Sequence, residues 1–284
     1  MDANFMSEPY LGLLIGAAPD LPPLFESHSD LEWIVQQTAT IEVGLALLRR
    51  RRFDLVVVED GRPTGGGGDY VASIRAAQPG VPVILIDAVP SSADLIDAMQ
   101  QKAYCYFSRP FLAGAVRDMM ESAVRRPEFD DSIRVTSALP EFLTLKIRCT
   151  LSTADRLLQF MEEMKFDLDP DERVGVATAF RELLVNAIEH GGHLNPEQWV
   201  RVSRVRSKRS LVYHMEDPGS GFSLSTLNHA AVSHPDESPV AHIEVRDRAG
   251  LRMGGFGILM AKKLVDEVIY NEQGNEVILV KYLD

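Results

Sequence analysis

The spacing of hydrophobic residues divides the chain into two halves with different patterns. In the first half, runs that are apolar at nearly every position alternate with amphipathic segments of helical periodicity. These runs are Leu11–Ile15, Asp54–Val58, Val81–Ile86 and Tyr104–Phe107. Strands that are apolar on both faces are typical of a parallel sheet with helices on both sides. The first half is therefore predicted to be an α/β domain.

The second half combines amphipathic helices with strands that alternate apolar and polar residues. Helical periodicity covers Ser152–Met164, Asp171–Gly191 and Gly257–Asp266. Trp199–Val205 and Ser210–Glu216 alternate on either side of a basic turn, which predicts an antiparallel hairpin. This order of elements predicts an α+β domain in which helices and an antiparallel sheet form two layers.

A polar segment bounded by prolines separates the two halves. Residues 128–140 follow Pro127, begin with an acidic stretch and end at Pro140. Such segments are typical of linkers between domains. The predicted organisation is a domain at 1–127, a linker at 128–140 and a second domain at 141–284.

Composition and charge narrow the classes of partner. The chain of 284 residues has a formal net charge of −12, so direct binding of nucleic acid through a broad basic surface is not expected. No run approaches the roughly 20 apolar residues that a membrane span needs. The two cysteines, Cys105 and Cys149, form no C-x-x-C motif and are expected to be free thiols in the cytoplasm.

Three short motifs in the second half carry the candidate chemistry. Glu182, Asn186 and His190 recur every four residues, which places them on one face of a helix. The segment Glu216–Gly221 ends an apolar strand with an acid followed by two glycines, and Gly254–Gly257 leads into a helix. A helix N-terminus preceded by glycines suits an anion, because free N–H groups and the helix dipole face it. Each motif alone also fits a solvated helix face or an ordinary turn.

Together, in this order and spacing, the three motifs resemble the N, G1 and G2 boxes of the superfamily that holds gyrase, histidine kinases and the anti-sigma-factor serine kinases. The tail is similar to the anti-sigma kinase branch in Gly257–Met260, Val265–Val268 and Gly274–Val277. The resemblance covers residues 141–284. It implies a Bergerat-fold ATPase domain that binds ATP and Mg²⁺.

The resemblance also implies roles for individual polar residues. Asn186 matches the residue that holds the Mg²⁺ bridging the phosphates, and an amide oxygen suits that ion. Asp217 matches the acid that accepts a hydrogen bond from the adenine amino group. Glu182 matches the proposed general base, which takes the proton from an attacking serine hydroxyl or water.

Four glycines and a histidine complete the implied site. Gly219 and Gly221 let the backbone approach the base, and Gly255 and Gly257 match the glycines beside the phosphates. His190 belongs to the same motif, and two interpretations stay open for it: contact with the nucleotide, or a structural histidine that packs near Asn186.

The first half resembles a response-regulator receiver domain of flavodoxin-like fold, with changes at each key position. Matching segments are Asp54–Glu59 with Pro63 beyond it, Val81–Ile86 and Ser108–Phe111. Gly16–Pro19 stands where a receiver has its Mg²⁺-binding acidic pair, Glu59 replaces the phospho-accepting Asp, Asp87 replaces the switch Thr/Ser and Arg109 replaces the Lys. We therefore expect a pseudo-receiver; the alternative is that Asp60 accepts phosphate after a shift in register.

The two resemblances together imply a function. We expect an ATP-dependent serine/threonine protein kinase that phosphorylates an anti-sigma-factor antagonist, has a sigma factor as second partner and is regulated by the pseudo-receiver. A homodimer is expected by analogy with the family. The alternative is a regulatory protein that binds ATP and sequesters a partner without phosphotransfer. A histidine kinase is disfavoured, because no dimerising helix with a phospho-acceptor His precedes the ATPase region.

Overall fold

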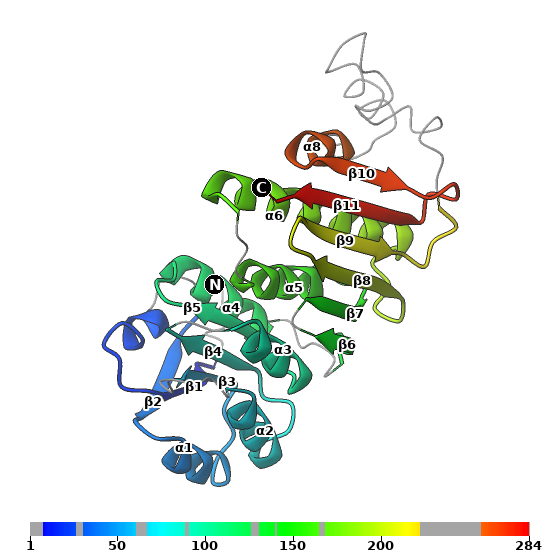
Figure 1. The fold of residues 1–284 in the computed structure, drawn as a ribbon. Coiled ribbons are helices and arrows are strands. Elements are labelled where there is room, and N and C mark those ends of the chain that lie inside the picture. Colours follow the sequence, from blue (N-terminus) through cyan, green and yellow to red (C-terminus); the bar gives the residue numbers. More distant parts are fainter. Residues whose placement is uncertain are drawn as a thin grey trace, which may run out of the picture. The chain divides into compact units, whose positions relative to one another are not determined.

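The chain divides into two compact units whose main boundary falls between Ser132 and Ile133 (Figure 1). The structure is a computed structural model that describes residues 8–26, 31–60, 67–88, 91–125, 131–139, 141–164, 168–221 and 257–283. Within these ranges no helix combines the length and the apolar character that a membrane span requires.

The first unit is built on a five-stranded parallel sheet with the order β2-β1-β3-β4-β5. Its strands are β1 (Tyr10–Ile15), β2 (Trp33–Thr38), β3 (Leu55–Asp60), β4 (Val83–Asp87) and β5 (Cys105–Ser108). The central strands are buried on both faces, with Val56, Val57, Ile84 and Leu85 showing 0% exposure. This confirms the predicted α/β sheet. Because β1 lies between β2 and β3, the sheet has a crevice at the carboxyl ends of β1 and β3, where ligands of open α/β sheets bind.

Helices cover both faces of this sheet. They are the 3₁₀ helix η1 (Pro22–Phe25) and the α-helices α1 (Ile41–Leu48), α2 (Gly67–Ala77), α3 (Ser92–Gln100) and α4 (Ala113–Arg125). Helix α4 packs with η1 on one face, where Leu14, Val57 and Ile86 join Val116 and Met120 in a core cluster. Helices α1, α2 and α3 contact one another in sequence and, through β1, β2, β4 and β5, contact the sheet.

The second unit is a six-stranded antiparallel sheet with the order β10-β11-β9-β8-β7-β6. Its strands are β6 (Ile133–Leu139), β7 (Phe142–Arg148), β8 (Trp199–Arg206), β9 (Ser210–Glu216), β10 (Glu267–Tyr270) and β11 (Glu276–Tyr282). Its α-helices are α6 (Pro170–Asn186), α8 (Gly257–Leu264) and the first part of α5 (Leu151–Glu163), which from Gln159 on is assigned to the first unit. Helix α6 contacts β9 and β11, and α8 packs against α6 (Figure 1). The α+β class predicted from the alternating strands is confirmed.

The expected linker at 128–140 is corrected by strand β6. Residues 133–139 of that segment pair with β7 from Ile133 to Leu139. Only Ile133 is buried in β6, and the rest of the strand is half-buried or exposed. An edge strand with so few buried side chains has the composition of a linker, which is why the hydrophobic pattern missed it.

The start of helix α5 also differs from the expectation. The sequence predicts a helix from Ser152, but the helix already begins at Leu151. Thr150 caps it, because its Oγ1 accepts a hydrogen bond from the Thr153 N–H at 3.2 Å. Asp169 occupies the N-cap position of α6, without a side-chain capping bond.

Candidate functional site

Helix α6 presents the first candidate motif at its carboxyl end. Leu183 and Leu184 are buried and anchor the helix, while Glu182 and Asn186 are half-buried on another face. Both polar residues lie within the α-helical part, so their spacing of four aligns them as the sequence predicted.

The helix changes its pitch directly after Asn186. Residues Ala187–Gly191 form a π-helical turn, and the Gly192 N–H donates to the Ala187 carbonyl at 2.9 Å. A π-turn is wider than an α-turn. His190, four residues after Asn186, lies within this turn, is exposed and borders the same pocket as Asn186.

Asp217 follows β9 and lies against the loop that ends this π-turn. Its Oδ1 accepts a hydrogen bond from the Gly219 N–H at 2.8 Å, and its own N–H donates to the Asn275 carbonyl at 2.9 Å. A Cβ added at Gly191 would lie 2.2 Å from Asp217 Cγ, and one at Gly219 would lie 2.9 Å from Gly191 Cα. Two glycines are therefore needed for this approach between β9 and the end of α6.

Asp217 is half-buried, and its pKa reflects this setting. Burial raises the pKa of Asp217, and Glu216 adds to the rise, whereas the Gly219 N–H and His193 oppose it. Burial, followed by the charge of Asp217, also raises the pKa of the neighbouring Cys149 to about 11 and raises the pKa of Tyr270. Asp217 is thus a partly desolvated carboxylate that a hydrogen-bond donor from a ligand would stabilise.

The turn between β10 and β11 closes this end of the pocket. Gly221 has φ +80°, and a Cβ there would lie 1.9 Å from the Gln273 carbonyl oxygen. Asn271 Oδ1 fixes the turn by accepting hydrogen bonds from the backbone N–H groups of Gly274 at 2.7 Å and Asn275 at 3.1 Å. Only glycine allows the chain after Asp217 to lie against this turn in that conformation.

The other end of the site is the N-terminus of α8. Its first residue is Gly257, and a Cβ there would lie 2.7 Å from Glu182 Oε2 and 3.5 Å from Asn186 Nδ2. The free N–H groups of a helix N-terminus therefore stand beside a carboxylate and an amide on α6. Gly255, the other glycine expected here, lies outside the described residues.

The end of α6, Asp217 and the β10–β11 turn surround a cavity of about 200 Å³, and Glu182 and Gly257 are not among its described lining residues. Among the expected site residues, its walls include Asn186, His190, Asp217, Gly219 and Gly221. The walls also include residues that the sequence interpretation did not assign to the site: His193, Tyr270, Gly274, Asn275 and Glu276. The motif Gly274–Val277 was noted only as a family signature, and its place in the wall follows from the hairpin packing against Gly221.

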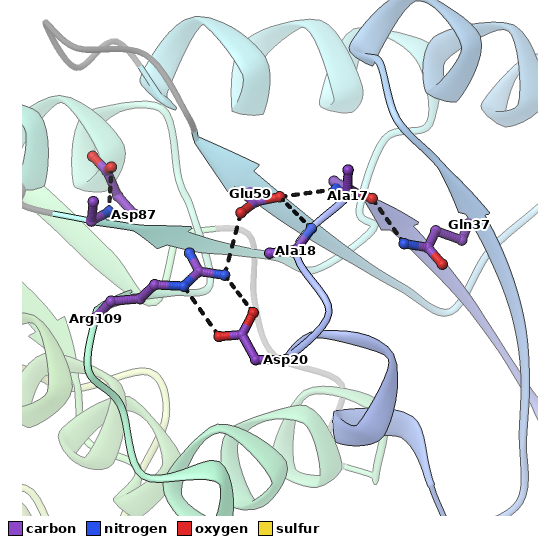
Figure 2. Close-up of polar contacts among 9 residues, drawn as sticks. Ala17, Ala18, Asp20, Gln37, Glu59, Asp87 and Arg109 are labelled. Atoms are coloured by element: carbon purple, nitrogen blue, oxygen red, sulfur yellow. Dashed lines mark hydrogen bonds and ion pairs between the residues drawn. The ribbon is translucent and has the colours of Figure 1, made fainter.

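The changed positions of the first unit also lie together, at the carboxyl edge of its sheet (Figure 2). Glu59 Oε2 accepts hydrogen bonds from the backbone N–H groups of Ala17 at 2.9 Å and Ala18 at 3.1 Å. Arg109 Nη2 lies 3.3 Å from Glu59 Oε1. The guanidinium also donates to both carboxylate oxygens of Asp20, from Nε at 3.1 Å and from Nη2 at 3.0 Å.

Asp87 takes part in a separate set of contacts at the end of β4. It is 4% exposed, and its Oδ2 accepts a hydrogen bond from the Tyr106 hydroxyl at 3.0 Å. Its carbonyl accepts the Arg109 N–H at 2.8 Å. Asp60 is the last residue of β3, and its side chain lies outside what the structure describes. The alternative that Asp60 accepts phosphate after a shift in register therefore stays a hypothesis.

Comparison with known proteins finds similarity for both parts of the chain. A family model described as a histidine kinase-like ATPase domain matches residues 147–281. The serine-protein kinase RsbW of Oceanobacillus iheyensis is 26% identical over 147 residues, which cover 51% of this chain and 82% of that protein.

Other relatives are response regulators. The KDP operon transcriptional regulatory protein KdpE of Escherichia coli is 28% identical over 174 residues, 56% of this chain and 73% of that protein. The response regulator PilR of Pseudomonas aeruginosa is 27% identical over 123 residues, and the matched part is only 28% of its length. Among solved structures, an orphan response regulator of H. pylori shows 24% identity and a TM-score of 0.36, covering 41% of this chain and 97% of that one.

Proposed function

We propose that this chain is an ATP-dependent serine/threonine protein kinase of the anti-sigma-factor type. Its residues 147–281 match a histidine kinase-like ATPase domain, and a receiver-like domain precedes them. Its substrate would be an anti-sigma-factor antagonist that presents a serine or threonine hydroxyl. A sigma factor would be the second partner, transcription the process regulated, and a homodimer the working form.

One observation carries the proposal: Asn186 is shared by two ends of one site. It borders the cavity that Asp217 closes, and it also stands beside Gly257 together with Glu182. A half-buried carboxylate for a base at one end and a helix N-terminus for phosphates at the other match the two chemically different ends of ATP.

The donor set fits Mg-ATP. Asp217 would accept a hydrogen bond from the adenine amino group, and burial, the largest influence on its pKa, raises that pKa. The Asn186 amide oxygen is a ligand type that Mg²⁺ accepts alongside phosphate oxygens and water. When bound, ATP supplies the phosphoryl group and Mg²⁺ neutralises phosphate charge.

Glu182 would act on the protein substrate. Its carboxylate stands at the N-terminus of α8, where the phosphates would lie, and there it would accept the proton of the attacking hydroxyl. The α8 N–H groups would hold negative charge in place during transfer. These roles need no movement of the β10–β11 turn, which only closes the end occupied by the base.

The direct test separates nucleotide binding from transfer. Mg-ATP is titrated calorimetrically into the full chain, and transfer of labelled phosphate to a panel of small anti-sigma-factor antagonists is measured. Glu182→Gln should keep ATP affinity within about threefold but lower transfer by roughly 10²–10⁴-fold. Glu189→Gln, seven residues further on and outside the cavity wall, is the matched control and should change neither.

The outcomes discriminate between the two functions considered. Retained transfer in Glu182→Gln would rule out that residue as the base. Binding of ATP without transfer to any antagonist, in the unmodified chain, would favour a regulatory protein that holds ATP and sequesters a partner. Loss of affinity in Asn186→Ala would establish that both functions use the same site.

A further inference from the structure

At the carboxyl edge of the first sheet, one cation is surrounded by three carboxylates. The pKa of the Arg109 guanidinium is raised, first by its hydrogen bond with Asp20 and then by the charges of Asp20, Glu59 and Asp87. Arg109 is only 25% exposed and Glu59 21% exposed, so their ion pair is partly shielded from water. Such a pair is screened less by salt than one on the open surface.

The remaining oxygens of two carboxylates are engaged by donors of the chain itself. Glu59 accepts the N–H groups of Ala17 and Ala18 (Figure 2). Asp87 accepts a hydrogen bond from the Tyr106 hydroxyl. The loop after β1, the end of β3 and the segment after β5 are therefore connected through charged and hydrogen-bonded groups. Bonds of this type to an ionised carboxylate contribute more than neutral ones.

A magnesium ion, which resemblance to receivers implies for this edge, does not fit these residues. Mg²⁺ requires oxygen ligands in octahedral geometry. Ala17 and Ala18 offer no side-chain oxygen and turn their N–H groups toward Glu59. The space between Glu59 and Asp20 holds the Arg109 guanidinium, which would repel a second cation.

The loop after β1 has little freedom to open a metal site. Gly16 has φ +155°, and a Cβ at that position would lie 2.6 Å from the Cβ of Glu59. The Gly16 carbonyl also accepts a hydrogen bond from Gln37 Nε2 at 2.9 Å, which ties the loop to β2. The loop is thus held from two sides, by Glu59 and by Gln37.

We propose that Arg109 is a built-in cation that fixes the receiver-like domain in one arrangement. Through Glu59 and Asp20 it joins three segments that a receiver would rearrange around Mg²⁺ and a phosphoryl group. The domain is then set permanently, and neither Mg²⁺ nor a phosphoryl donor changes it. Regulation through this domain must enter by another surface. This proposal is independent of the kinase activity, since no residue of the ATP site takes part.

Hydrogen exchange of the Ala17 and Ala18 amides in the full chain tests the proposal without reference to ATP. Their exchange should be unchanged, within about twofold, when Mg²⁺ and beryllofluoride or acetyl phosphate are added. Glu59→Gln and Arg109→Met should accelerate it by roughly 10–100-fold, because a hydrogen bond to a charged acceptor is weakened or lost. Arg125→Met removes the ion pair of Arg125 with Glu121 on α4 and should leave both amides unchanged.

Two results would overturn the proposal. One is a change of about tenfold or more in these amides when the unmodified chain meets Mg²⁺ with beryllofluoride. The other is an Arg109→Met protein whose Ala17 and Ala18 amides exchange as slowly as before. The first comparison uses the unmodified chain, so it decides the question even if a variant fails to fold.

Discussion

Asp217 in the second domain and Asp20 in the first are aspartates whose pKa values are shifted in opposite directions. Burial raises the pKa of Asp217, and a backbone N–H only partly offsets this. The hydrogen bonds and charge of Arg109 lower the pKa of Asp20. One domain therefore holds a carboxylate that gains from a new donor, and the other holds a carboxylate whose donors are already supplied by the chain.

The difference separates two kinds of site. The site at Asp217 offers a carboxylate to a ligand, whereas at Asp20 the Arg109 guanidinium already pairs with the carboxylate. Both contain a glycine whose added Cβ would lie 2.7 Å from a glutamate Oε2: Gly257 beside Glu182, and Gly16 beside Glu59. Near Gly257, Asn186 borders a cavity of about 200 Å³. Gly16 and Glu59 also border a cavity, of about 330 Å³, but Glu59 is already bonded to Ala17, Ala18 and Arg109. Similar residue types thus give a site that is open to a donor from a ligand in one domain and, in the other, a carboxylate that the chain itself has already bonded.

The largest effect should come from replacing the carboxylate of the open site. Asp217→Asn should weaken Mg-ATP binding by roughly 10–150-fold, because a hydrogen bond between a charged acceptor and the adenine amino group becomes a neutral or mismatched one. Isothermal titration calorimetry measures this directly.

The neighbouring acid provides the control for Asp217→Asn. Glu216→Gln removes a carboxylate that pairs with Arg201 at 3.0 Å and does not border the cavity. The affinity of this variant for Mg-ATP should stay within about twofold of that of the unmodified chain. Equal affinity in the unmodified chain and Asp217→Asn would contradict the assignment of Asp217 to the base.

The two glycines should respond differently to the same substitution. Gly16→Ala should lower the free energy of unfolding by about 1–3 kcal/mol, because the new Cβ meets the Cβ of Glu59, which cannot move away, at an unfavourable φ. Gly257→Ala meets only the end of the Glu182 side chain, which can rotate. Its stability should change by less than about 1 kcal/mol, while transfer falls roughly tenfold through misplacement of Glu182.

Thermal denaturation and single-turnover transfer assays read these two effects separately. A Gly16→Ala protein as stable as the original would mean that the loop after β1 adjusts easily, against the closed character of that edge. A Gly257→Ala protein with full transfer would show that transfer does not depend on the close approach of Glu182 to the N-terminus of α8.

The smallest effects are expected in Tm and its dependence on pH. Neutralising Asp20 and neutralising Asp217 should shift Tm in opposite directions. The folded pKa of Asp20 lies below its ordinary 3.8, so its ionised form stabilises the fold above that pH, and the contribution is lost as the pH falls through the folded pKa. Asp20→Asn should therefore lower Tm by about 2–4 °C at pH 7 and by less near pH 3.

Asp217→Asn should show the opposite sign. The folded pKa of Asp217 lies above 3.8, so the native state binds its proton more tightly, and stability falls as the pH rises through the window between the two values. Removing the charge should raise the Tm of the nucleotide-free protein at pH 7, with little change near pH 3. Shifts of the same sign in both variants would refute the comparison.

The parts predicted correctly are those in which local pattern and tertiary burial agree. Runs such as Val81–Ile86 are apolar on both faces, and that pattern suffices for a buried parallel strand. Glu182 and Asn186 lie within one regular helix, so their spacing alone determines that they share a face. The motif resemblance places Asp217 and Gly257 in one domain, but only the fold shows Asn186 beside Gly257 and in the wall of the cavity that Asp217 also borders.

The parts that were missed depend on contacts with distant segments. Strand β6 owes its conformation to pairing with β7, since little of it is buried. The π-turn at Ala187–Gly191 accommodates the packing of Gly191 on Asp217 and of Gly192 on Cys149, which no helical periodicity reveals. The filling of the receiver edge by Arg109 likewise involves Asp20, a residue that the receiver motifs do not single out.

Strand β6 also determines how the second domain would respond to a pull on the chain that enters it. The chain joins the sheet at its β6 edge, while Asp217 follows β9, three strand spacings or roughly 14 Å away. The pairing of β6 with β7 is irregular between Val135 and Ser137, whereas β7 with β8 and β8 with β9 pair without a shift. Tension on the linker should therefore detach β6 first and leave the nucleotide pocket intact. A pull on the linker would thus be absorbed at β6 and not passed on to Asp217.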